Sequence, residues 1–499
     1  MKKILVLFLL LVASTASLSA QSSAAPEVEE LWYVVELSDA KAGWVMIRSS
    51  REGGELTTEN TMHMEIRRGP AQMTLTTESR FVEKEGQPLR AWTSQALGQM
   101  PVEATWEFGP EVVKVRTLQG ESVREQELPM PETAWLTPGA AEDRIREMLD
   151  KGAEEFSITT VDPQLGLQPV TTNWNLLERD DEIETAAGNI ITTRWRQSQS
   201  YAPQIEMIVN IDEEGRIVRS VTPVLGMNTT LTLSTREEAL LATSEGAPEL
   251  LIQTFVRPDK PIEKPRKVRR AIYRLTVDGG SPEDLDVNFG RQTSEIAGQT
   301  LRLMITNEPK APDSPENGAR YLRSTLFLPH DNPLIRKLLA DALPESGGAG
   351  PQEKAVALRD FVAAYVTEKD LDTVLATAAE VAESRSGDCT EHAVLLSTLL
   401  RAAGIPARVV TGLVYVQQFA GASDIFGYHM WSQALIGGRW VDLDAALGSA
   451  ESGKDYFVDA THIALGTSAL DDEQSILKEV AKIATVMGRL KIDVVEVDY

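Results

Sequence analysis

Cysteine occurs once in this chain of 499 residues, as Cys389. One cysteine cannot form an internal disulfide, so burial of apolar side chains has to stabilise the fold. Basic residues are also scarce, since 49 Lys and Arg stand against 74 Asp and Glu and the formal net charge is −25. Because nucleic acid and anionic membranes would repel such a chain, we predict neither as a partner.

Long apolar runs are confined to the start of the chain. Two lysines precede an apolar run from Ile4 to Ala13, which is too short to span a bilayer, and small residues follow it. This order is typical of a secretory signal peptide, and we predict one over residues 1–20 that is cleaved near Ala20. The mature protein is therefore expected in the periplasm or outside the cell, without a stable membrane anchor.

The first half of the chain is dominated by period-two alternation. LWYVVEL, TMHMEIRR and IEMIVNI alternate apolar with polar residues, which predicts antiparallel strands with one face on a core. EGQPLR (85–90) and EGRIVR (214–219) predict similar hairpin turns, and AAEDRIREMLDKG (140–152) predicts a helix between them. One shared hexamer is a weak signal that the two halves are related, so duplication is the less favoured interpretation. We predict a strongly curved β domain over 27–250, for which a scaffold role is favoured over capture of a peptide or glycopeptide.

The second half of the chain predicts a different architecture. Residues 251–268 are rich in proline and charge and predict an extended connector, which is followed by a β segment over 269–320. NPLIRKLLADAL and EKAVALRDFVAAYVTEK have helical spacing, and strands resume after GIPAR. Helices grouped with antiparallel strands are typical of an α+β domain, which we place at 321–470. A helix and a strand complete the chain over 471–499.

The stretch SGDCTEH places the single cysteine at the start of a predicted helix. Asp388 and Glu391 have the spacing of a capping box. The helix is therefore expected to run from Cys389 to about Ala403 and to end at Gly404. The first turn of a helix favours negative charge, and so a thiolate. On position alone two interpretations stand equal: the cysteine is a nucleophile, or it packs as a small apolar side chain.

The base that would activate this thiol is predicted from a hairpin. Two alternating runs, YHMWSQALI and RWVDLDAAL, flank Gly437-Gly438, which is a strong signal for a two-residue turn. In that register Asp444 lies opposite Trp431 and is the diagonal neighbour of His429 on the same face. Such neighbours are about 7–8 Å apart at the backbone, so the two side chains can meet.

Two other residues could take the roles of this pair. Asp442 shares the face but lies two residues further from His429, so Asp444 is the better orienting carboxylate. His392 leans back toward Cys389 from three residues along the helix, but it adjoins the apolar stripe. Cys389, His429 and Asp444 would supply the nucleophile, the base and the tautomer-fixing acid of acyl-transfer chemistry.

One acidic stretch imitates a metal site. Four side chains have the spacing of calcium ligands, namely Asp284, Asp286, Asn288 and Glu295. Phe289 stands where such a loop needs glycine, so an ordinary acidic turn is favoured. We predict neither a metal nor a cofactor.

Three sequence blocks resemble, in order, the bacterial transglutaminase-like domain of the papain-like cysteine superfamily. They are GDCTEHAVLLSTLLRAAGIPARVVTGLVYV, YHMWSQALIGGRWVDLDAAL and DATHIALG. The resemblance covers roughly residues 321–470 and implies a papain-like fold. It assigns the family's nucleophile to Cys389, its histidine to His429 and its aspartate to Asp444. His462 belongs to the same pattern, and a structural role is expected for it.

Two departures from the family pattern concern reactivity. Ala445-Ala446 replace the Pro-Thr that usually follows the aspartate. Animal transglutaminases steady the oxyanion with a tryptophan upstream of the cysteine, but none lies between Trp195 and Trp431 here. Backbone N–H groups near Cys389 are therefore the expected oxyanion donors.

The residues and the resemblance together favour one function. We expect an exported thiol enzyme that hydrolyses or transfers the acyl group of an amide or isopeptide bond in a peptide or protein substrate. The alternative is a non-catalytic envelope protein that retains the fold to bind peptides or proteins. A structural envelope protein whose β domain is the active part is less favoured.

Overall fold

The computed structural model describes residues 27–68, 71–96, 101–119, 122–224, 227–242, 247–248, 254–285, 287–307, 318–343, 349–368, 376–447, 458–470 and 486–499. The predicted signal peptide lies outside these ranges, as does the predicted C-terminal helix except for its last two residues. The chain forms two compact units that divide between residues 250 and 251. No helix in the described ranges is long and apolar enough to cross a membrane.

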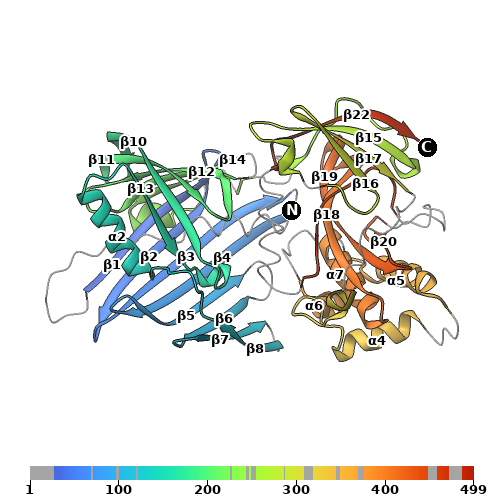
Figure 1. The fold of residues 1–499 in the computed structure, drawn as a ribbon, viewed down its shortest axis with the longest axis horizontal. Helices are drawn as coiled ribbons and strands as arrows, with labels where there is room; N and C mark the ends of the chain where they lie inside the picture. Colours follow the sequence, from blue (N-terminus) through green and yellow to red (C-terminus); the bar gives the residue numbers. More distant parts are fainter. Residues whose placement is uncertain are drawn as a thin grey trace. The chain divides into compact units, whose positions relative to one another are not determined.

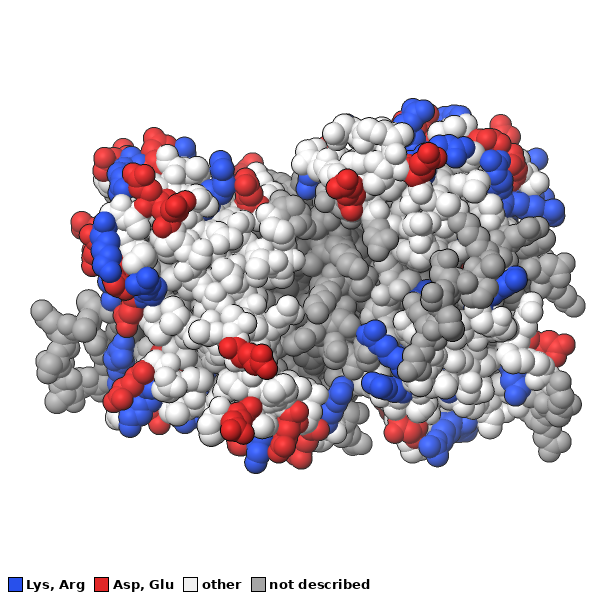
Figure 2. Space-filling view, in the orientation of Figure 1, with Lys and Arg blue, Asp and Glu red and all other residues white. Residues whose placement is uncertain are grey.

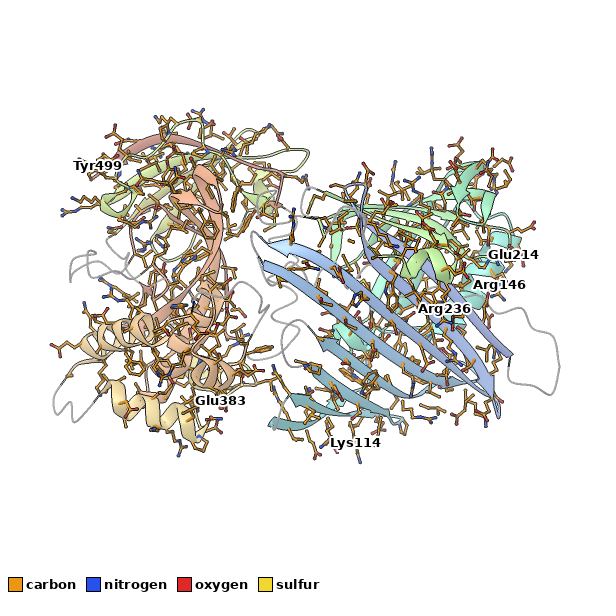
Figure 3. The ribbon with its side chains drawn as sticks, turned by 180° about the vertical axis from the view of Figure 1, so that it is seen from behind. Lys114, Arg146, Glu214, Arg236, Glu383 and Tyr499 are labelled. Carbon is orange, nitrogen blue, oxygen red and sulfur yellow. The ribbon has the colours of Figure 1, made fainter. Side chains whose placement is uncertain are left out.

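The N-terminal unit is built on one antiparallel sheet of 14 strands (Figure 1). The strands are β1 (Glu27–Leu37), β2 (Ala40–Glu52), β3 (Glu55–Arg68), β4 (Ala71–Lys84), β5 (Gln87–Ala96), β6 (Val102–Phe108), β7 (Val112–Gln119), β8 (Ser122–Pro129), β9 (Glu155–Thr160), β10 (Val170–Thr185), β11 (Gly188–Gln199), β12 (Ala202–Ile211), β13 (Ile217–Val224) and β14 (Met227–Ser234). Their order is β8-β7-β6-β5-β4-β3-β2-β1-β14-β13-β12-β11-β10-β9. Neighbouring strands pair antiparallel, as β3 does with β2 and β4, which confirms the predicted antiparallel sheet. Figure 3 shows the sheet from behind with its side chains.

The turns and the helix predicted for this unit are present. Lys84 pairs with Gln87 around the first predicted turn, and β12 and β13 flank the second. Helix α2 (Pro138–Asp150) lies between β8 and β9, as predicted. The short helix α3 (Arg236–Leu240) and the 3-10 turn η1 (Pro163–Leu165) complete the unit.

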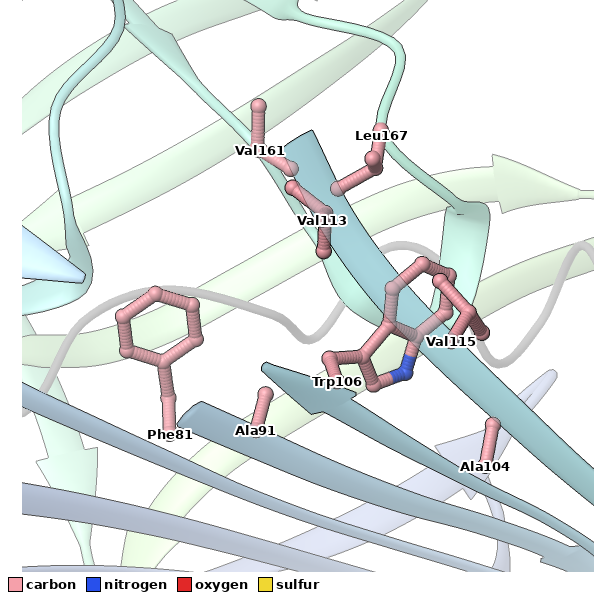
Figure 4. Packing of buried hydrophobic residues seen from close by; sticks show 8 residues of the cluster. All are labelled: Phe81, Ala91, Ala104, Trp106, Val113, Val115, Val161 and Leu167. Carbon is pink, nitrogen blue, oxygen red and sulfur yellow. The ribbon is translucent and has the colours of Figure 1, made fainter. Parts of the chain in front are cut away.

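Packing on the inner face shows that the sheet is strongly curved. Figure 4 shows Phe81, Trp106 and Val113, from β4, β6 and β7, in one cluster with Val161 and Leu167, which follow β9. Since β7 and β9 lie near opposite ends of the strand order, the sheet has to bend for these side chains to meet. The predicted curvature is therefore confirmed.

Helix α2 fills another part of the inner face. Its Ile145 packs against Trp174 and Trp195 from β10 and β11. At its start, Glu83 of β4 accepts hydrogen bonds from Thr137 Oγ1 at 2.7 Å and Gly139 N at 2.9 Å. The helix thus connects distant strands of the sheet through apolar packing on one side and a buried carboxylate on the other.

The C-terminal unit contains two four-stranded antiparallel sheets, ordered β16-β17-β15-β22 and β20-β19-β18-β21. Their strands are β15 (Arg270–Val277), β16 (Gln292–Ala297), β17 (Thr300–Thr306), β18 (Ala407–Phe419), β19 (Ala422–Ile436), β20 (Arg439–Leu443), β21 (His462–Ser468) and β22 (Leu490–Asp498). The helices are α4 (Pro333–Ala342), α5 (Pro351–Tyr365), α6 (Ala378–Ser384) and α7 (Cys389–Ala402), with 3-10 turns η3 (Pro265–Lys267), η4 (Pro282–Asp284) and η5 (Gly318–Leu322). Within this unit the four α-helices gather at the end opposite β15, β17 and β22 (Figure 1). Figure 3 marks Glu383 on α6 and Tyr499 just after β22.

Helix α7 is the central helix of this unit. Residues 390–401 are all buried, and α7 packs against α4, α5, α6, β18 and β19. At its end the guanidinium of buried Arg401 donates to the carbonyl oxygens of Arg323, Ala407 and Ala469 at 2.6 to 3.0 Å. Gly404 follows with φ +76°, so the helix stops where the sequence predicted.

A single buried guanidinium joins the two sheets. Arg291 precedes β16, and its Nε donates to Asp442 Oδ2 at 2.7 Å on β20. Its Nη1 and Nη2 donate to the carbonyl oxygens of Val458 and Asp459 at 3.0 and 3.3 Å. Val458 and Asp459 lie just before β21. Through Arg291, the sheet formed by β15, β16, β17 and β22 therefore binds both β20 and the segment that leads into β21.

Charge on the surface is mixed despite the large acidic excess. In the face drawn in Figure 2, acidic and basic side chains are interspersed instead of forming one continuous acidic surface. Ion pairs such as Arg194–Glu178, with 2.7 Å between Nη2 and Oε2, are largely exposed. Exposed pairs contribute little to stability, so the core and the few buried pairs have to supply most of it.

We predict that Arg291→Met lowers the free energy of unfolding by about 3 kcal/mol, because it leaves Asp442 without its buried cationic partner. Urea unfolding followed by tryptophan fluorescence would measure the change. The matched control is Arg274→Met on β15, whose exposed pair with Asp493 has an N–O distance of 3.4 Å. The control should change stability by less than about 1 kcal/mol. Equal effects of the two substitutions would contradict a stabilising role for the buried pair.

Candidate active site

Cys389 is the first residue of α7, and the predicted capping box surrounds it. Asp388 Oδ1 accepts from Thr390 N at 2.8 Å, while Glu391 Oε2 accepts from Asp388 N at 3.0 Å. Cys389 is half-buried, unlike the fully buried residues that follow it in the helix. Cys389 therefore stands at the partly exposed start of a helix whose next twelve residues are buried.

The backbone before the cap depends on Gly387. This residue has φ +147°, and a Cβ there would lie 2.3 Å from the Cβ of Glu391. Any larger residue would displace the side chain that closes the capping box. The glycine in SGDCTEH thus lets the chain enter the helix at the angle that places Cys389 in the first turn.

His429 lies on β19, and the hairpin after it has the predicted register. Ile436 pairs with Arg439 across the Gly437-Gly438 turn, in which both glycines have positive φ. The hydroxyl of Ser432, three residues beyond His429, donates to the carbonyl oxygen of Ala393 in α7 at 3.0 Å. This hydrogen bond holds β19 against the helix that carries the thiol.

Asp444 differs in one detail from the prediction. The ladder between β19 and β20 ends at Ser432–Leu443, so Asp444 does not pair with Trp431. Instead, its Oδ1 accepts from the N–H groups of Ala446 and Leu447 at 2.8 and 3.1 Å. These bonds turn the chain out of the strand, because an aspartate that binds the N–H two residues ahead forms a turn of its own.

The structure nevertheless brings the three predicted residues together. His429 Nε2 lies 2.8 Å from Asp444 Oδ2, and Cys389 is close enough for its charge to raise the pKa of His429. Since Nε2 faces the carboxylate, Nδ1 is the ring nitrogen left for the sulfur. His429 is 8% exposed and Asp444 is 3% exposed, so the pair is shielded from water.

The electrostatics of the site favour a charged histidine. Burial opposes the imidazolium, but the charges of Asp444 and Cys389 and the hydrogen bond to Asp444 raise the pKa of His429 to about 10. Burial likewise opposes the carboxylate, yet His429 and a hydrogen bond from His462 hold the pKa of Asp444 well below its usual range. An imidazolium beside the sulfur is the arrangement that stabilises a thiolate.

The rival residues have other roles. His392 is 1% exposed, and its Nδ1 lies 2.6 Å from the carbonyl oxygen of Asp388, so that nitrogen donates to the backbone. Asp442 accepts from Trp431 Nε1 at 2.6 Å. The Trp431 ring in turn stacks on His429, with 6.1 Å between the ring centroids. Asp442 therefore holds the Trp431 ring beside His429 and does not itself orient His429.

His462, for which the sequence indicated only a structural role, contacts the site directly. Its Nε2 lies 3.2 Å from Asp444 Oδ2, the same oxygen that His429 binds. It is 2% exposed and begins β21, which pairs with the far side of β18. The block DATHIALG signalled this residue, but no spacing in the sequence shows that it reaches Asp444.

Gly412 on β18 makes this convergence possible. It lies between His429 on β19 and Ala464 on β21 in the strand register. A Cβ there would be 2.1 Å from the carbonyl oxygen of Ile463 and 2.8 Å from the Trp431 ring. Because Gly412 has no side chain, the Trp431 ring lies over β18, between His429 and His462.

The donor atoms of His429, Asp444 and His462 lie within 4.8 Å of one another, a spacing that a metal ion would also fit. Both histidines, however, turn Nε2 toward the carboxylate at hydrogen-bonding distance, so hydrogen bonds account for the cluster. In the acidic stretch that imitates a calcium loop, Asp286 lies outside the described residues, and exposed Glu295 is on β16. The prediction of no metal or cofactor stays a prediction.

Comparison with known proteins identifies the class of the C-terminal unit. Residues 340–445, which include Cys389, His429 and Asp444, match the model of the transglutaminase-like superfamily. The chain therefore carries a transglutaminase-like domain. With the helices and sheets described above, this confirms the predicted fold class, an N-terminal antiparallel β region followed by an α+β transglutaminase-like domain.

Solved structures show only distant similarity. A candidate cysteine protease from Cytophaga hutchinsonii is 15% identical, with a TM-score of 0.28, and the match covers 46% of this chain and 89% of that one. A β-barrel-like protein of the DUF1849 domain from Brucella abortus is 9% identical, with a TM-score of 0.31 and coverages of 41% and 94%. A candidate protease from Parabacteroides distasonis is 12% identical, with a TM-score of 0.20 and coverages of 77% and 69%. No curated protein matches the chain, and at these TM-scores nothing is inferred from the structures.

We predict that Gly412→Ala disrupts the site, because the new Cβ would collide with the backbone of β21. The free energy of unfolding should fall by about 3 kcal/mol or more, as in other overpacked cores. The control is Gly427→Ala on β19, where the nearest atom to a new Cβ is a side-chain carbon at 3.6 Å. Thermal unfolding of both variants would measure the difference, and equal melting temperatures would contradict the predicted close approach.

A second prediction concerns the pH dependence of stability. Because the folded-state pKa of His429 is raised to about 10, its contribution is complete below about pH 6.5 and is lost as the pH rises through 10. From pH 7 to 10, the wild type should therefore lose on the order of 2 kcal/mol more than His429→Gln in urea unfolding. His63→Gln in the other unit should follow the wild type. Parallel curves for wild type and His429→Gln would contradict the ion pair.

Proposed function

We propose that this protein is a cysteine-dependent enzyme that cleaves or transfers the acyl group of an amide or isopeptide bond. The observation that carries the proposal is the 2.8 Å hydrogen bond between His429 and Asp444, beside a cysteine whose charge raises the pKa of His429. These three residues come from a helix start, a central strand and the turn after another strand. A packed core alone has no need for a thiol, an imidazole and a carboxylate in this order.

The first half of the reaction follows from this arrangement. The Cys389 sulfur, as a thiolate beside the His429 imidazolium, attacks the carbonyl carbon of the amide and forms a tetrahedral intermediate. When the C–N bond breaks, the imidazolium gives its Nδ1 proton to the leaving nitrogen. The products of this half are an acyl-Cys389 thioester, a free amine and a neutral His429.

The second half regenerates the enzyme. Neutral His429 takes a proton from water or from an acceptor amine, which attacks the thioester carbonyl. The C–S bond breaks, and the thiolate is restored beside the imidazolium. Water gives a free acid, and an amine gives a new amide. Throughout both halves Asp444 binds Nε2 and keeps Nδ1 aligned with the sulfur.

An oxyanion donor is available at the start of the helix. The Asp388 side chain accepts from the N–H groups of Thr390 and Glu391. The N–H of Cys389, which these bonds do not use, is the proposed donor to the reacting carbonyl. Such a donor stabilises the negative oxygen of the tetrahedral intermediate. This agrees with the expectation that backbone groups replace the tryptophan of animal transglutaminases.

The substrate and the cellular site belong to the same proposal. A net charge of −25 disfavours nucleic acid, and the start of the sequence has the form of a secretory signal. The proposed substrate is therefore a peptide or protein of the cell envelope, reached in the periplasm or outside the cell. The N-terminal sheet is proposed as a scaffold.

The test uses the single cysteine, since alkylation of a thiol by iodoacetamide reports on Cys389 alone. The second-order rate constant at pH 7 should fall about tenfold or more in His429→Ala, because the imidazolium no longer stabilises the thiolate. Asp444→Asn should lower it less, and Cys389→Ser should abolish labelling. A thiol whose reactivity ignores His429 would instead support a non-catalytic peptide-binding protein.

A further inference from the structure

The carboxylate of Asp444 is shared between two histidines. Its Oδ2 accepts from His429 Nε2 at 2.8 Å and from His462 Nε2 at 3.2 Å. Its Oδ1 accepts from the backbone N–H groups of Ala446 and Leu447. Four donors therefore surround this buried carboxylate, and only one of them belongs to the proposed base.

This division of partners fixes the direction of the carboxylate. The two backbone donors hold Oδ1 on the side of the turn, and the two histidines hold Oδ2 on the side of the sheet. If His462 were absent, Oδ2 would keep one side-chain partner, and the carboxylate could rotate away from His429. Loss of one hydrogen bond to a buried charge is enough to change a rate about tenfold.

His462 is itself held from its other side. Its Nδ1 lies 3.3 Å from Asp459 Oδ1. Asp459 Oδ1 also accepts from Thr461 N at 2.8 Å, and Arg266 Nη1 donates to Asp459 Oδ2 at 2.6 Å. These contacts hold the pKa of Asp459 below its usual range, although its burial opposes this. The Asp459 carboxylate lies at ion-pair distance from Nδ1 without forming a hydrogen bond to it, and its charge favours the ring orientation in which Nε2 carries a proton toward Asp444.

We propose that His462, oriented by Asp459, is a positioning residue that donates a hydrogen bond to Asp444 and thereby keeps His429 aligned with Cys389. This inference rests on the proposed function and adds a second histidine and a second aspartate to it. His462 lies beyond the residues that match the family model, which end at 445. It acts through Asp444 and does not touch the reacting atoms.

The test compares two substitutions by the rate of Cys389 alkylation with iodoacetamide at pH 7. His462→Phe keeps a ring in the buried site but removes the donor, whereas His462→Gln keeps an N–H donor and loses the ring. The hydrogen bond predicts that His462→Phe lowers the rate about tenfold, while His462→Gln stays within about threefold of wild type. If His462 only fills space, Phe will match or exceed Gln, and this result would overturn the proposal.

A double-mutant cycle with His429→Ala shows whether His462 acts through the base. In the His429→Ala background, His462→Phe should have no further effect on alkylation, because its only route to the sulfur is gone. An unchanged effect in that background would overturn the proposal. If His429→Ala alone leaves the wild-type rate unchanged, the proposed function fails instead, so the two failures are distinguishable. His63→Gln in the other unit is the control and should leave the rate unchanged.

A second variant covers the case in which His462→Phe does not fold. Asp459→Asn keeps the size of the side chain but weakens the contacts that orient His462, so the rate should fall about threefold. Circular dichroism would show that the fold is retained. A folded Asp459→Asn variant with the wild-type rate would overturn the proposal.

Discussion

The buried carboxylate of Asp444 is the constraint around which the site is organised. A carboxylate at 3% exposure is costly unless each of its oxygens is paired. Here the pairing needs three separate segments: β19 supplies His429, β21 supplies His462, and the turn after β20 supplies two N–H groups. The requirement to satisfy one charge thus draws the outer strands of a four-stranded sheet to a common point.

The same requirement explains why the second sheet of this unit matters to a site that it does not line. Arg291 holds Asp442, which supports Trp431 beside both histidines, and it also binds the carbonyl oxygen of Asp459. Gln292 adds a further link, because its side chain pairs with both the N–H and the carbonyl of Ala464 on β21. The position of His462 is therefore set from β16 as well as from β18.

Local signals in the sequence were sufficient for the parts of the site that depend on neighbouring residues. The capping box of Asp388 and Glu391 placed Cys389 at a helix start, and the Gly437-Gly438 pair determined the hairpin register that puts His429 near Asp444. Both work because capping and two-residue turns involve only residues a few positions apart. The ladder ended at Leu443, before the predicted pairs of Asp444 with Trp431 and of Ala446 with His429. The Asp444 side chain competes for backbone N–H groups there, an effect that alternation alone does not reveal.

The remaining contacts had no local signal. Arg291 and Asp442 are 151 residues apart, and β22 pairs with β15 across more than 200 residues. No short sequence motif marks such long-range pairs, because many buried arginines and strands are compatible with the same periodicity. For His462, the sequence block identified the residue but not its partner. Its partner, Asp444, follows only from the pairing of β21 with β18, on the side opposite β19.

This division has a physical consequence for how the site is held. The start of helix α7 and the β19–β20 hairpin place Cys389 and His429 in the same region of the domain. The final alignment of His429 with Cys389 then depends on where the Asp444 carboxylate points, and long-range buried polar contacts decide that direction. Such contacts are strong only while water is excluded and every partner is satisfied. The packing around Trp431, and the close approach of strands that Gly412 permits, are therefore part of the alignment of the base and not only of the stability of the domain.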